Sequence, residues 1–540
     1  MPSNIQSKIL IVGAGPTGLM MGILLAREGI PFRIIDKNSE RAPHSRALAV
    51  QTRTLELLQD LRLLDQFMSG GQEMNEVYFH SRKKQIGRFS LKGVASPFSF
   101  TLIHPQERTE KILEEHLISR GVKVERGVAL TEVSTNGQVI IGEEKLHYDY
   151  ILGCDGGHSI VREKIQIPFV GSDRKELFAL ADLKVQGPID PHAMNGFFSP
   201  EGIAGFIPMP EGFTRLVASN MKERKELNLS TIAKLIERRT KRNFIVSDLK
   251  WTSYFYTHFR HSATMRKKNI FLFGDAAHIH SPVGGQGMNT GLQDSYNFAW
   301  KLARVVRGEA KPELLETYEE ERMQVAESLL RWTSQMTKLV TLQKNIFLLM
   351  RNSILSYLFK RKFFQRKLRA WMTQTRINYR ESSLSRENKP TFFSALFSRK
   401  RREFRLGPHA GDRALDAEIT LFNEPAISTL YEILSGTKFV LLAFASKRLR
   451  PKLLAELKEV IPQDFATYLI ASDEQHPLIK PWNGKVILDR TALLRKSYGV
   501  SHSSLYLIRP DNYIAYRSYG FDIPALKKFL HGASFSPEHL

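Results

Sequence analysis

Short apolar runs that lead into glycine-rich turns mark three separated parts of the chain. Ile9–Val12 is such a run and enters a turn at Gly13–Gly18; a helical pattern and a second run ending at Asp36 follow. The same arrangement returns at Tyr148–Ser159 and at Asn269–His278. Continuous apolar runs of this length are typical of strands buried on both faces of a parallel sheet. We therefore predict an α/β fold whose central sheet is interrupted by an insertion.

The insertion has a different pattern from the segments around it. Between residues 166 and 269 several β-type runs follow one another, which predicts a second, mostly antiparallel sheet. The runs are Phe178–Val185, Gly205–Met209, Thr214–Ala218 and Lys250–Phe259. Residues 1–165 and 270–330 are assigned to a Rossmann-like nucleotide-binding domain, with 71–100 contributing to the inserted substrate domain.

The second half of the chain divides into three stretches. Residues 331–380 carry apolar positions at helical spacing, and 381–405 are polar, basic and Ser-rich, as expected of a linker. Residues 406–540 alternate strand and helix patterns, which predicts a further α/β domain. Its strand-like runs are Phe439–Phe444, Ala466–Ile470, Lys485–Leu488 and Ser504–Ile508, and its helical ones Lys447–Val460 and Ile523–Leu530.

The first turn, Gly13-Ala14-Gly15-Pro16-Thr17-Gly18, has the spacing of a dinucleotide-binding loop. Gly13 permits the tight turn, Gly15 allows a pyrophosphate to approach the backbone, and Gly18 lets the helix pack near the strand. The helix N-terminus offers N–H groups to phosphate. Asp36 ends the second strand, where a carboxylate can bind an adenosine ribose. A simple glycine-rich turn is the alternative, but the strand, helix and acid in register favour nucleotide binding.

Composition and charge exclude several classes of protein. Cys154 is the only cysteine, which excludes a disulfide framework, a thiolate zinc site and a redox pair within one chain. No metal site is predicted. The first strand starts by Lys8, and Leu339–Phe359, the most apolar long stretch, contains Lys344 and Arg351, so we expect neither a signal peptide nor a membrane span. A cytoplasmic location is expected.

The net charge of +23 is concentrated in one segment. Residues 351–405 contain sixteen Lys or Arg and three acids, which gives +13 in this stretch. A solvated helical face with a linker is the favoured interpretation. Peripheral contact with an anionic membrane is the alternative, because apolar side chains interleave with the cations. These are Phe359, Phe363, Phe364, Leu368 and Trp371. Nucleic-acid binding is not expected, since no nucleic-acid module accompanies the charge.

The three glycine-rich segments together resemble the group A FAD-dependent aromatic hydroxylases, which have the p-hydroxybenzoate hydroxylase fold. The resemblance rests on Gly13–Gly18, on Cys154–Arg162, and on Gly274–Pro282 with Gly284–Gly291, and it covers about residues 8–400. The C-terminal domain resembles the thioredoxin-like domain of the phenol and pentachlorophenol monooxygenase branch, at Gly407–Arg413 and Ile508–Arg517. It contains no cysteine, so we expect a scaffold or dimer-contact role and no redox role.

The resemblance implies how the chain holds FAD. The glycine turn would take the pyrophosphate with Arg46 nearby, and Gln106 would touch the ribityl or isoalloxazine part. Asp275 ends a buried strand, so its carboxylate can accept ribityl hydroxyl protons; an ordinary turn aspartate is the alternative. The other residues implied to contact FAD or NADPH are Asp155, His158, Arg162, Gly274, Gly285, Gly287, Met288 and Asn289, and Pro282 would lie where the flavin C4a oxygen adduct forms.

The implied reaction is hydroxylation of a phenolic or polycyclic aromatic substrate. NADPH or NADH would reduce FAD, and O2 would form a flavin C4a-hydroperoxide that oxygenates the ring. Tyr254, Tyr256 and His258 alternate on one inserted strand and share a face, so they are candidates to bind the substrate phenol; an aromatic core stripe is the alternative.

Two other functions stay open at this point. One is a membrane-peripheral hydroxylase of the quinone or sterol type, and the other is a non-hydroxylating FAD-binding protein. A flavin halogenase is excluded because the Trp-x-Trp-x-Ile-Pro segment of that class is absent. The substrate, the choice between NADPH and NADH, and a homodimer also stay open.

Overall fold

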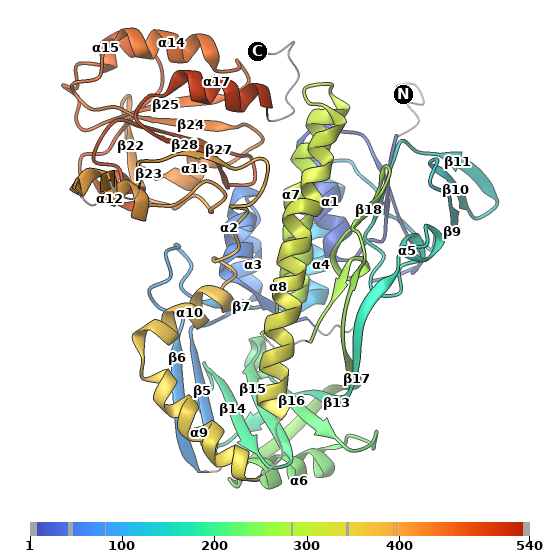
Figure 1. The fold of residues 1–540 in the computed structure, drawn as a ribbon. Helices are drawn as coiled ribbons and strands as arrows, with labels where there is room; N and C mark the ends of the chain where they lie inside the picture. The colour runs from blue at the N-terminus through green and yellow to red at the C-terminus, as the bar shows by residue number, and fades with distance from the viewer. Residues whose placement is uncertain are drawn as a thin grey trace.

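The computed structural model describes residues 8–41, 47–81, 83–281, 284–341, 345–391, 394–395 and 397–532. Three large sheets organise the chain: a parallel sheet, a long antiparallel sheet beside it, and a C-terminal sheet covered by helices (Figure 1). The predicted α/β fold with an inserted antiparallel sheet is thereby confirmed. Among the described residues, no helix is both long and apolar enough to cross a membrane.

The parallel sheet has the strand order β18-β19-β12-β1-β2-β8, and β18 alone runs antiparallel to its neighbour. Its strands are β1 (Ile9–Val12), β2 (Arg33–Asp36), β8 (Glu125–Arg126), β12 (Tyr150–Gly153), β18 (Arg266–Lys267) and β19 (Ile270–Leu272). The register aligns Val12 with Gly153, and Gly153 with Leu272. The turns that follow β1, β12 and β19 therefore meet at one edge of the sheet, because parallel strands end on the same side.

Helices surround this sheet and share its apolar core. α1 packs against both α4 and α7. The elements are α1 (Pro16–Arg27), α2 (Thr52–Asp60), α3 (Leu64–Gly70), α4 (Gln106–Ser119), α5 (Ile160–Lys164), η2 (Gly274–Ala276), α7 (Gly287–Val306) and η3 (Pro312–Leu315). A small sheet of β9 (Leu130–Val133), β10 (Gln138–Ile141) and β11 (Glu144–His147) contributes to the same core.

The inserted sheet has the order β20-β17-β13-β16-β15-β14-β5-β6, and only β14 and β5 pair in parallel. Its strands are β5 (Glu76–Ser81), β6 (Lys84–Ser90), β13 (Phe169–Gln186), β14 (Met194–Ser199), β15 (Gly202–Pro208), β16 (Thr214–Met221), β17 (Ile245–Ser262) and β20 (His278–Ile279). β5 and β6 join it from before the insertion. α6 (Leu229–Thr240) covers an apolar cluster on one face.

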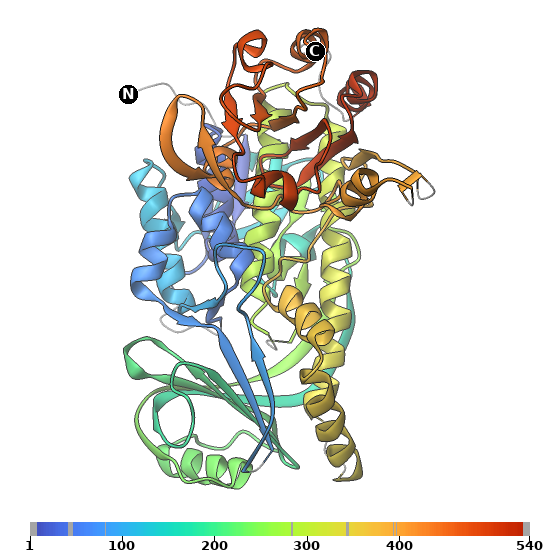
Figure 2. The same cartoon turned by 90° about the vertical axis from the view of Figure 1, so that its left-hand side faces the viewer.

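Two features connect the inserted sheet to the parallel one. A three-stranded sheet, β3 (Ala49–Val50), β7 (Thr101–Ile103) and β4 (Gln72–Met74), leads directly into β5. The long helix α8 (Glu316–Thr341) contacts β15 and β17. After it, α9 (Asn345–Phe359) and α10 (Lys362–Met372) lie along β6. α9 lies at the end of the molecule away from the C-terminal unit, and α10 leads back toward that unit (Figure 2).

The C-terminal unit is an eight-stranded sheet in the order β21-β28-β27-β24-β25-β26-β22-β23. Its strands are β21 (Arg386–Asn388), β22 (Glu418–Leu421), β23 (Glu424–Thr429), β24 (Val440–Phe444), β25 (Ala466–Ala471), β26 (Val486–Leu488), β27 (Ser504–Ile508) and β28 (Ile514–Tyr519). Its helices are α12 (Arg399–Leu406), α13 (Leu430–Leu434), α14 (Lys452–Val460), α15 (Ile479–Trp482), α16 (Leu493–Ser497) and α17 (Ile523–Gly532). An α/β unit is confirmed; its assignment as thioredoxin-like stays a prediction.

The stretch 381–405, expected to be a linker, contributes β21 and α12 to this unit. Glu387 on β21 accepts a hydrogen bond of 2.7 Å from the buried Arg517, and Phe404 on α12 is buried. One strand pairing and one buried aromatic ring are enough to order a segment whose composition is mostly polar. The polar composition therefore concealed two packed elements.

Candidate active site

The turn after β1 is packed on one side and open on the other. Gly13 has a φ of +101°, and a Cβ built on it would lie 2.5 Å from the Cys154 carbonyl oxygen. A Cβ on Gly18 would lie 1.9 Å from the Gly13 oxygen, so α1 packs directly on the turn. A Cβ on Gly15, in contrast, would meet no atom within 4 Å. Together with the uncapped N-terminus of α1, this leaves a cradle of the kind that holds a phosphate.

Asp36 closes the turn from the end of β2. One carboxylate oxygen accepts a hydrogen bond of 2.7 Å from the Ala14 N–H, and the other accepts one of 2.8 Å from the Asn38 N–H. A carboxylate has about four acceptor positions, so these two bonds leave capacity for ribose hydroxyl groups. The side chain is half-buried beside the phosphate cradle, which fits the adenosine end of a dinucleotide.

The turn after β12 lies against the first turn. The Cβ position of Gly13 is 2.8 Å from the Asp155 Cα, which shows how closely the two backbones approach. Asp155 Oδ2 accepts a hydrogen bond of 3.1 Å from the Val161 N–H, and burial raises the pKa of this carboxyl. Asp155 therefore orders the start of α5, and His158 is exposed on the turn between them.

Arg162 joins this turn to the third segment. Its guanidinium donates hydrogen bonds of 2.8 Å to the Ala276 oxygen and 2.8 Å to the Gly157 oxygen, and it lies 3.9 Å from the centre of the Phe169 ring. Burial lowers its pKa. These contacts favour a structural role over the predicted contact with a nicotinamide dinucleotide.

The third segment meets the first through Thr17. A Cβ on Gly274 would lie 2.6 Å from Thr17 Oγ1, and a Cβ on Gly291 would lie 2.4 Å from the same atom. Only glycine fits at both positions while Thr17 keeps this place. Gly274 also has a φ of +54°, and Asp275 follows it on η2 with an exposed side chain. The three glycine-rich segments thus converge at one edge of the parallel sheet.

The loop before α7 is held by a buried amide. Asn289 Nδ2 donates hydrogen bonds of 2.8 Å to the Ala49 and Gly285 oxygens, and Asn289 Oδ1 accepts one of 2.8 Å from the Gln51 N–H. A Cβ on Gly285 would lie 2.8 Å from the Ala49 side chain, so the loop lies directly against β3. α7 begins at Gly287 without a side-chain cap. Its first N–H groups can therefore stabilise negative charge on a ligand.

Several predicted residues flank this arrangement. Gln106 is the first residue of α4 and donates a hydrogen bond of 2.8 Å to Glu110. Met288 is half-buried against the core. Arg46 and Pro282 lie outside the described residues, so the structure does not place them. Their roles stay predictions.

A buried charge cluster behind the loop was not predicted from the sequence. Asp294 on α7 accepts hydrogen bonds from Arg322 Nε at 2.6 Å and from the Gly274 N–H at 3.0 Å, and it lies 2.8 Å from His278 Nε2. Burial alone would raise the pKa of Asp294, but Arg322 and His278 together lower it. The only signal in the sequence is that polar residues recur along α7, a helix that is buried over most of its length.

The candidates on β17 alternate along the strand and lie in different surroundings. Tyr254 packs into the cluster under α6 and donates a hydrogen bond of 2.7 Å to the Lys225 oxygen. Tyr256 and His258 are exposed, whereas Phe255 and Phe259 on either side of them are buried. The alternation is real, but its phase depends on which face α6 covers, and the sequence does not show this. Tyr254 is thus engaged in the cluster under α6, and contact of these three side chains with the substrate stays a prediction.

The wall nearest the loop is apolar and rich in methionine. Leu48, Met74 and Ile103 are buried there, and partly buried side chains from β3 and from in and beside the inserted sheet pack against them. Those side chains are Ala49, Met194, Ile207 and Met209. Because Ala49 also contacts Gly285, this wall adjoins the loop and α7.

His280 lies between this loop and β20. Its Nε2 is buried and has no hydrogen-bond partner among the described residues, and it would be 3.5 Å from a Cβ on Gly287. Burial lowers the pKa of His280 to about 4. A neutral imidazole with one unused nitrogen therefore stands beside the start of α7.

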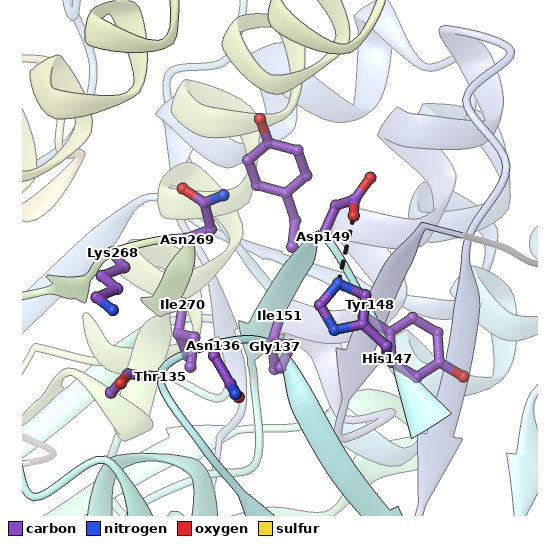
Figure 3. Close-up of a pocket in the computed structure, with 11 residues that line it drawn as sticks. Thr135, Asn136, Gly137, His147, Tyr148, Asp149, Ile151, Lys268, Asn269 and Ile270 are labelled. Carbon is purple, nitrogen blue, oxygen red and sulfur yellow. Dashed lines mark ion pairs between the residues drawn. The ribbon is translucent and has the colours of Figure 1, made fainter. Parts of the chain in front are cut away.

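A cavity of about 460 Å³ lies elsewhere, at the amino ends of β12 and β19 (Figure 3). It is lined by polar residues that include His147, Asp149 and Lys268, and His147 forms an ion pair of 3.7 Å with Asp149. Ligands of open α/β sheets bind at the carboxyl ends of the strands. The cavity in Figure 3 is therefore distinct from the site at the glycine-rich turns.

Comparisons with known proteins agree with this geometry. The family model described as FAD binding domain matches residues 6–333. The chain is 31% identical to 6-methylpretetramide 4-monooxygenase from Streptomyces rimosus, over 98% of this chain and 94% of that protein. It is 27% identical to pentachlorophenol 4-monooxygenase from Sphingobium chlorophenolicum, over 95% of this chain and 94% of that protein.

Solved structures show the same fold over the whole chain. The anhydrotetracycline hydroxylase OxyS from Streptomyces rimosus is 25% identical, with a TM-score of 0.73 and coverage of 98% of this chain and 99% of that chain. A ternary complex of aklavinone-11 hydroxylase with FAD and aklavinone is similar in fold, with a TM-score of 0.74 at 20% identity, covering 99% and 100% of the two chains. The chain belongs to the FAD binding domain family, among the group A FAD-dependent aromatic hydroxylases.

Proposed function

We propose that this enzyme uses FAD, a nicotinamide dinucleotide and O2 to hydroxylate a phenolic ring of a polycyclic aromatic substrate. One observation carries the proposal: Thr17, Gly274 and Gly291 come from two distant segments and meet at the edge where the Asp155 turn also lies. Such an arrangement surrounds an extended ligand that has a pyrophosphate in its middle. Two relatives act on 6-methylpretetramide and on pentachlorophenol, as their names state.

The residues present fit FAD. The open position at Gly15 and the N-terminus of α1 would take the pyrophosphate, and Asp36 would bind the adenosine ribose. Asp275 would bind ribityl hydroxyl groups, and the loop at Gly285 would lie along the isoalloxazine. When bound, FAD supplies the redox chemistry, taking electrons from the nicotinamide and activating O2.

The protein provides charge stabilisation and position at the flavin end of the site. The uncapped N-terminus of α7 directs its N–H groups and the positive end of the helix dipole at the loop, which favours an anionic ring system there. Asn289 fixes the loop against Ala49, so these donors are preorganised. His280 Nδ1 donates a hydrogen bond of 2.7 Å to the Ser281 oxygen, so Nε2 of the neutral ring is placed to accept one hydrogen bond within the same site.

The apolar wall determines which substrates fit. Leu48, Met74 and Ile103 are buried beside the loop, and Met194 and Met209 add flexible, polarisable side chains to the same cluster. A wall of this kind suits a flat, multi-ring compound and excludes water from the ring that reacts. Tyr254, Tyr256 and His258 are not part of this wall.

NADPH or NADH as the electron donor, and a homodimer as the assembled form, belong to the same proposal. The exposed His158 is the remaining candidate for a contact with the anionic dinucleotide, because Arg162 already binds backbone carbonyls. A comparison of the two nucleotides as reductants tests the first point, and sedimentation velocity tests the second.

The experiment is a screen of phenols and polycyclic phenols for compounds that stimulate NAD(P)H oxidation, with the product oxygen traced from labelled O2. We expect stimulated oxidation and labelled hydroxylated product for at least one multi-ring phenol. Oxidation that no compound raises above the background rate would support the non-hydroxylating alternative and reject the proposal.

A further inference from the structure

The two helices after α8 present an exposed surface in which apolar and cationic side chains are mixed. We define the α9–α10 surface by its exposed residues. They are Met350, Ile354, Tyr357, Lys360, Arg361, Lys362, Phe363, Arg366 and Lys367. The α9 part of the surface lies at the end of the molecule away from the C-terminal unit, and its α10 part lies nearer the middle of the molecule (Figure 1, Figure 2).

The apolar members of this surface lie on one side of α9. Met350, Ile354 and Tyr357 are spaced by four and three residues, so they share a helix face. Their exposed fractions are 55%, 54% and 57%. Leu355 and Phe359 on the opposite face are buried in the cluster on β6. The exposed stripe is therefore additional to the side chains that hold the helix in place.

α10 continues the surface with cations. Phe364 and Leu368 pack inward into the same cluster on β6, so Arg366 and Lys367 face outward with Phe363, which is 68% exposed. This corrects the predicted interleaving of aromatic and basic residues. Phe363 alone among those apolar side chains is exposed, and Trp371 packs on Trp332 at a ring distance of 4.7 Å.

The charge of this surface is uncompensated. The sequence contains no Asp or Glu between Glu327 and Glu381. Within the described part of the chain, none of the five cations of the surface forms an ion pair with an acidic side chain. A solvated helix usually interleaves both signs of charge, whereas a one-sign field attracts an oppositely charged partner.

We propose that the α9–α10 surface docks the enzyme onto an anionic lipid membrane. A helix that lies in the membrane interface presents exposed apolar side chains with Lys and Arg around them, and Tyr and Phe are suited to the headgroup level. A second copy of the chain is a poor occupant, because it would bring two acid-free faces together. Anionic headgroups supply the missing negative charge, and the hydrocarbon region supplies the apolar contact.

The same helices reach the candidate active site. Trp371 near the end of α10 lies 3.0 Å from the Cβ position of Gly284, and Gln286 Nε2 donates a hydrogen bond of 3.1 Å to the Met372 oxygen. The docking surface and the flavin loop are therefore parts of one packed structure. The inference goes beyond hydroxylation and does not depend on it, because membrane binding is measured without substrate.

The test is co-sedimentation of the full-length, FAD-loaded protein with phosphatidylcholine vesicles that contain or lack phosphatidylserine. We expect binding only to the anionic vesicles, and loss of binding at high salt. Arg366→Glu with Lys367→Glu should weaken binding by more than tenfold, because each basic residue removed costs about fivefold. Ile354→Asp should also weaken binding, at unchanged FAD content and thermal midpoint.

Matched control variants lie on the C-terminal unit. Arg448→Glu with Arg450→Glu makes the same charge change at exposed positions between β24 and α14, and Ile427→Asp alters an isoleucine that is 76% exposed. We expect both controls to bind as the unaltered protein does. Equal binding to neutral and anionic vesicles, no binding to either, or equal losses in the control and α9–α10 variants would overturn the proposal, and capture by an acidic protein in place of vesicles would do the same.

Discussion

Arg509, which follows β27, lies between Glu321 and Asp511 and joins the C-terminal unit to the FAD-binding core. Its guanidinium donates hydrogen bonds of 2.5 Å and 3.0 Å to Glu321 on α8, which also accepts one of 2.8 Å from Lys301 on α7. All three side chains are buried. Because α7 begins at the flavin loop, the contact connects the C-terminal sheet to the helix that forms the site.

Arg509→Met should destabilise the whole chain. The substitution leaves the buried Asp511 without its cation and Glu321 with Lys301 alone, and breaking a buried pair in this way costs about 3–5 kcal/mol. Urea unfolding followed by tryptophan fluorescence measures the change. Arg490→Met, which removes an exposed pair with Glu474, is the control and should have little effect. Equal stability of the two variants would show that the buried contact does not fasten the units.

The stability of the protein should depend on pH through Glu321. Burial alone would raise the pKa of this carboxyl, but Arg509 and Lys301 hold it below its ordinary value of 4.5. A depressed carboxyl pKa contributes stability that is present above the unfolded value and is lost as pH falls below it. Glu321→Gln should therefore destabilise strongly at neutral pH and progressively less below about pH 4.5. A destabilisation that is constant across thermal melts in this range would contradict the assignment.

Asp275→Ala should purify with little bound FAD. The carboxylate is exposed at the edge where the three segments meet, so its removal takes away an acceptor for ribityl hydroxyl groups without opening a cavity in the core. The ratio of flavin to protein absorbance measures the effect. Asp65→Ala on α3, another exposed aspartate, should keep the flavin. A variant at position 275 that retains its full flavin content would refute the ribityl role.

Met194→Trp should weaken the binding of a polycyclic substrate by about tenfold, which corresponds to about 1.4 kcal/mol. The larger ring occupies part of the apolar wall beside the loop, whereas the FAD contacts are made by other residues. Substrate titration followed by the change in the flavin absorbance band gives both affinities. Met350→Trp on α9 is the matched control and should leave substrate affinity unchanged, so equal effects of the two variants would remove Met194 from the wall.

The sequence predicted the local motifs well and their surroundings poorly. The turn at Gly13–Gly18 is recognisable because its geometry depends on glycines close together in the chain. The contact between Arg509 and Glu321 joins residues 188 positions apart, and no local sequence pattern predicts it. In the same way, Asp294 was overlooked because a buried acid is stabilised by partners, His278 and Arg322, that only folding brings near.

The sequence also did not show which face of each inserted strand points to the interior. Period-2 alternation on β17 predicted that Tyr254 and Tyr256 share a face, but α6 and α8 decide which face is inside. A sheet with helices on both sides gives no polar face from which to read this. The methionine wall was likewise hidden, because its members come from different short strands.

Gly15 provides the sharpest test of the central claim, that the three converging turns hold one FAD molecule. Gly15 has a φ of −75°, and its Cβ position is empty, whereas a Cβ on Gly18 would lie 1.9 Å from backbone. Gly15→Ala should therefore fold normally yet lose FAD, and Gly18→Ala should lose thermal stability even without FAD. The decisive measurement is an absorbance titration of the apo forms of the unaltered protein and Gly15→Ala with FAD. We predict one FAD per unaltered chain and at least tenfold weaker binding by the variant; equal affinity, or an unaltered protein that stays colourless, would contradict the account.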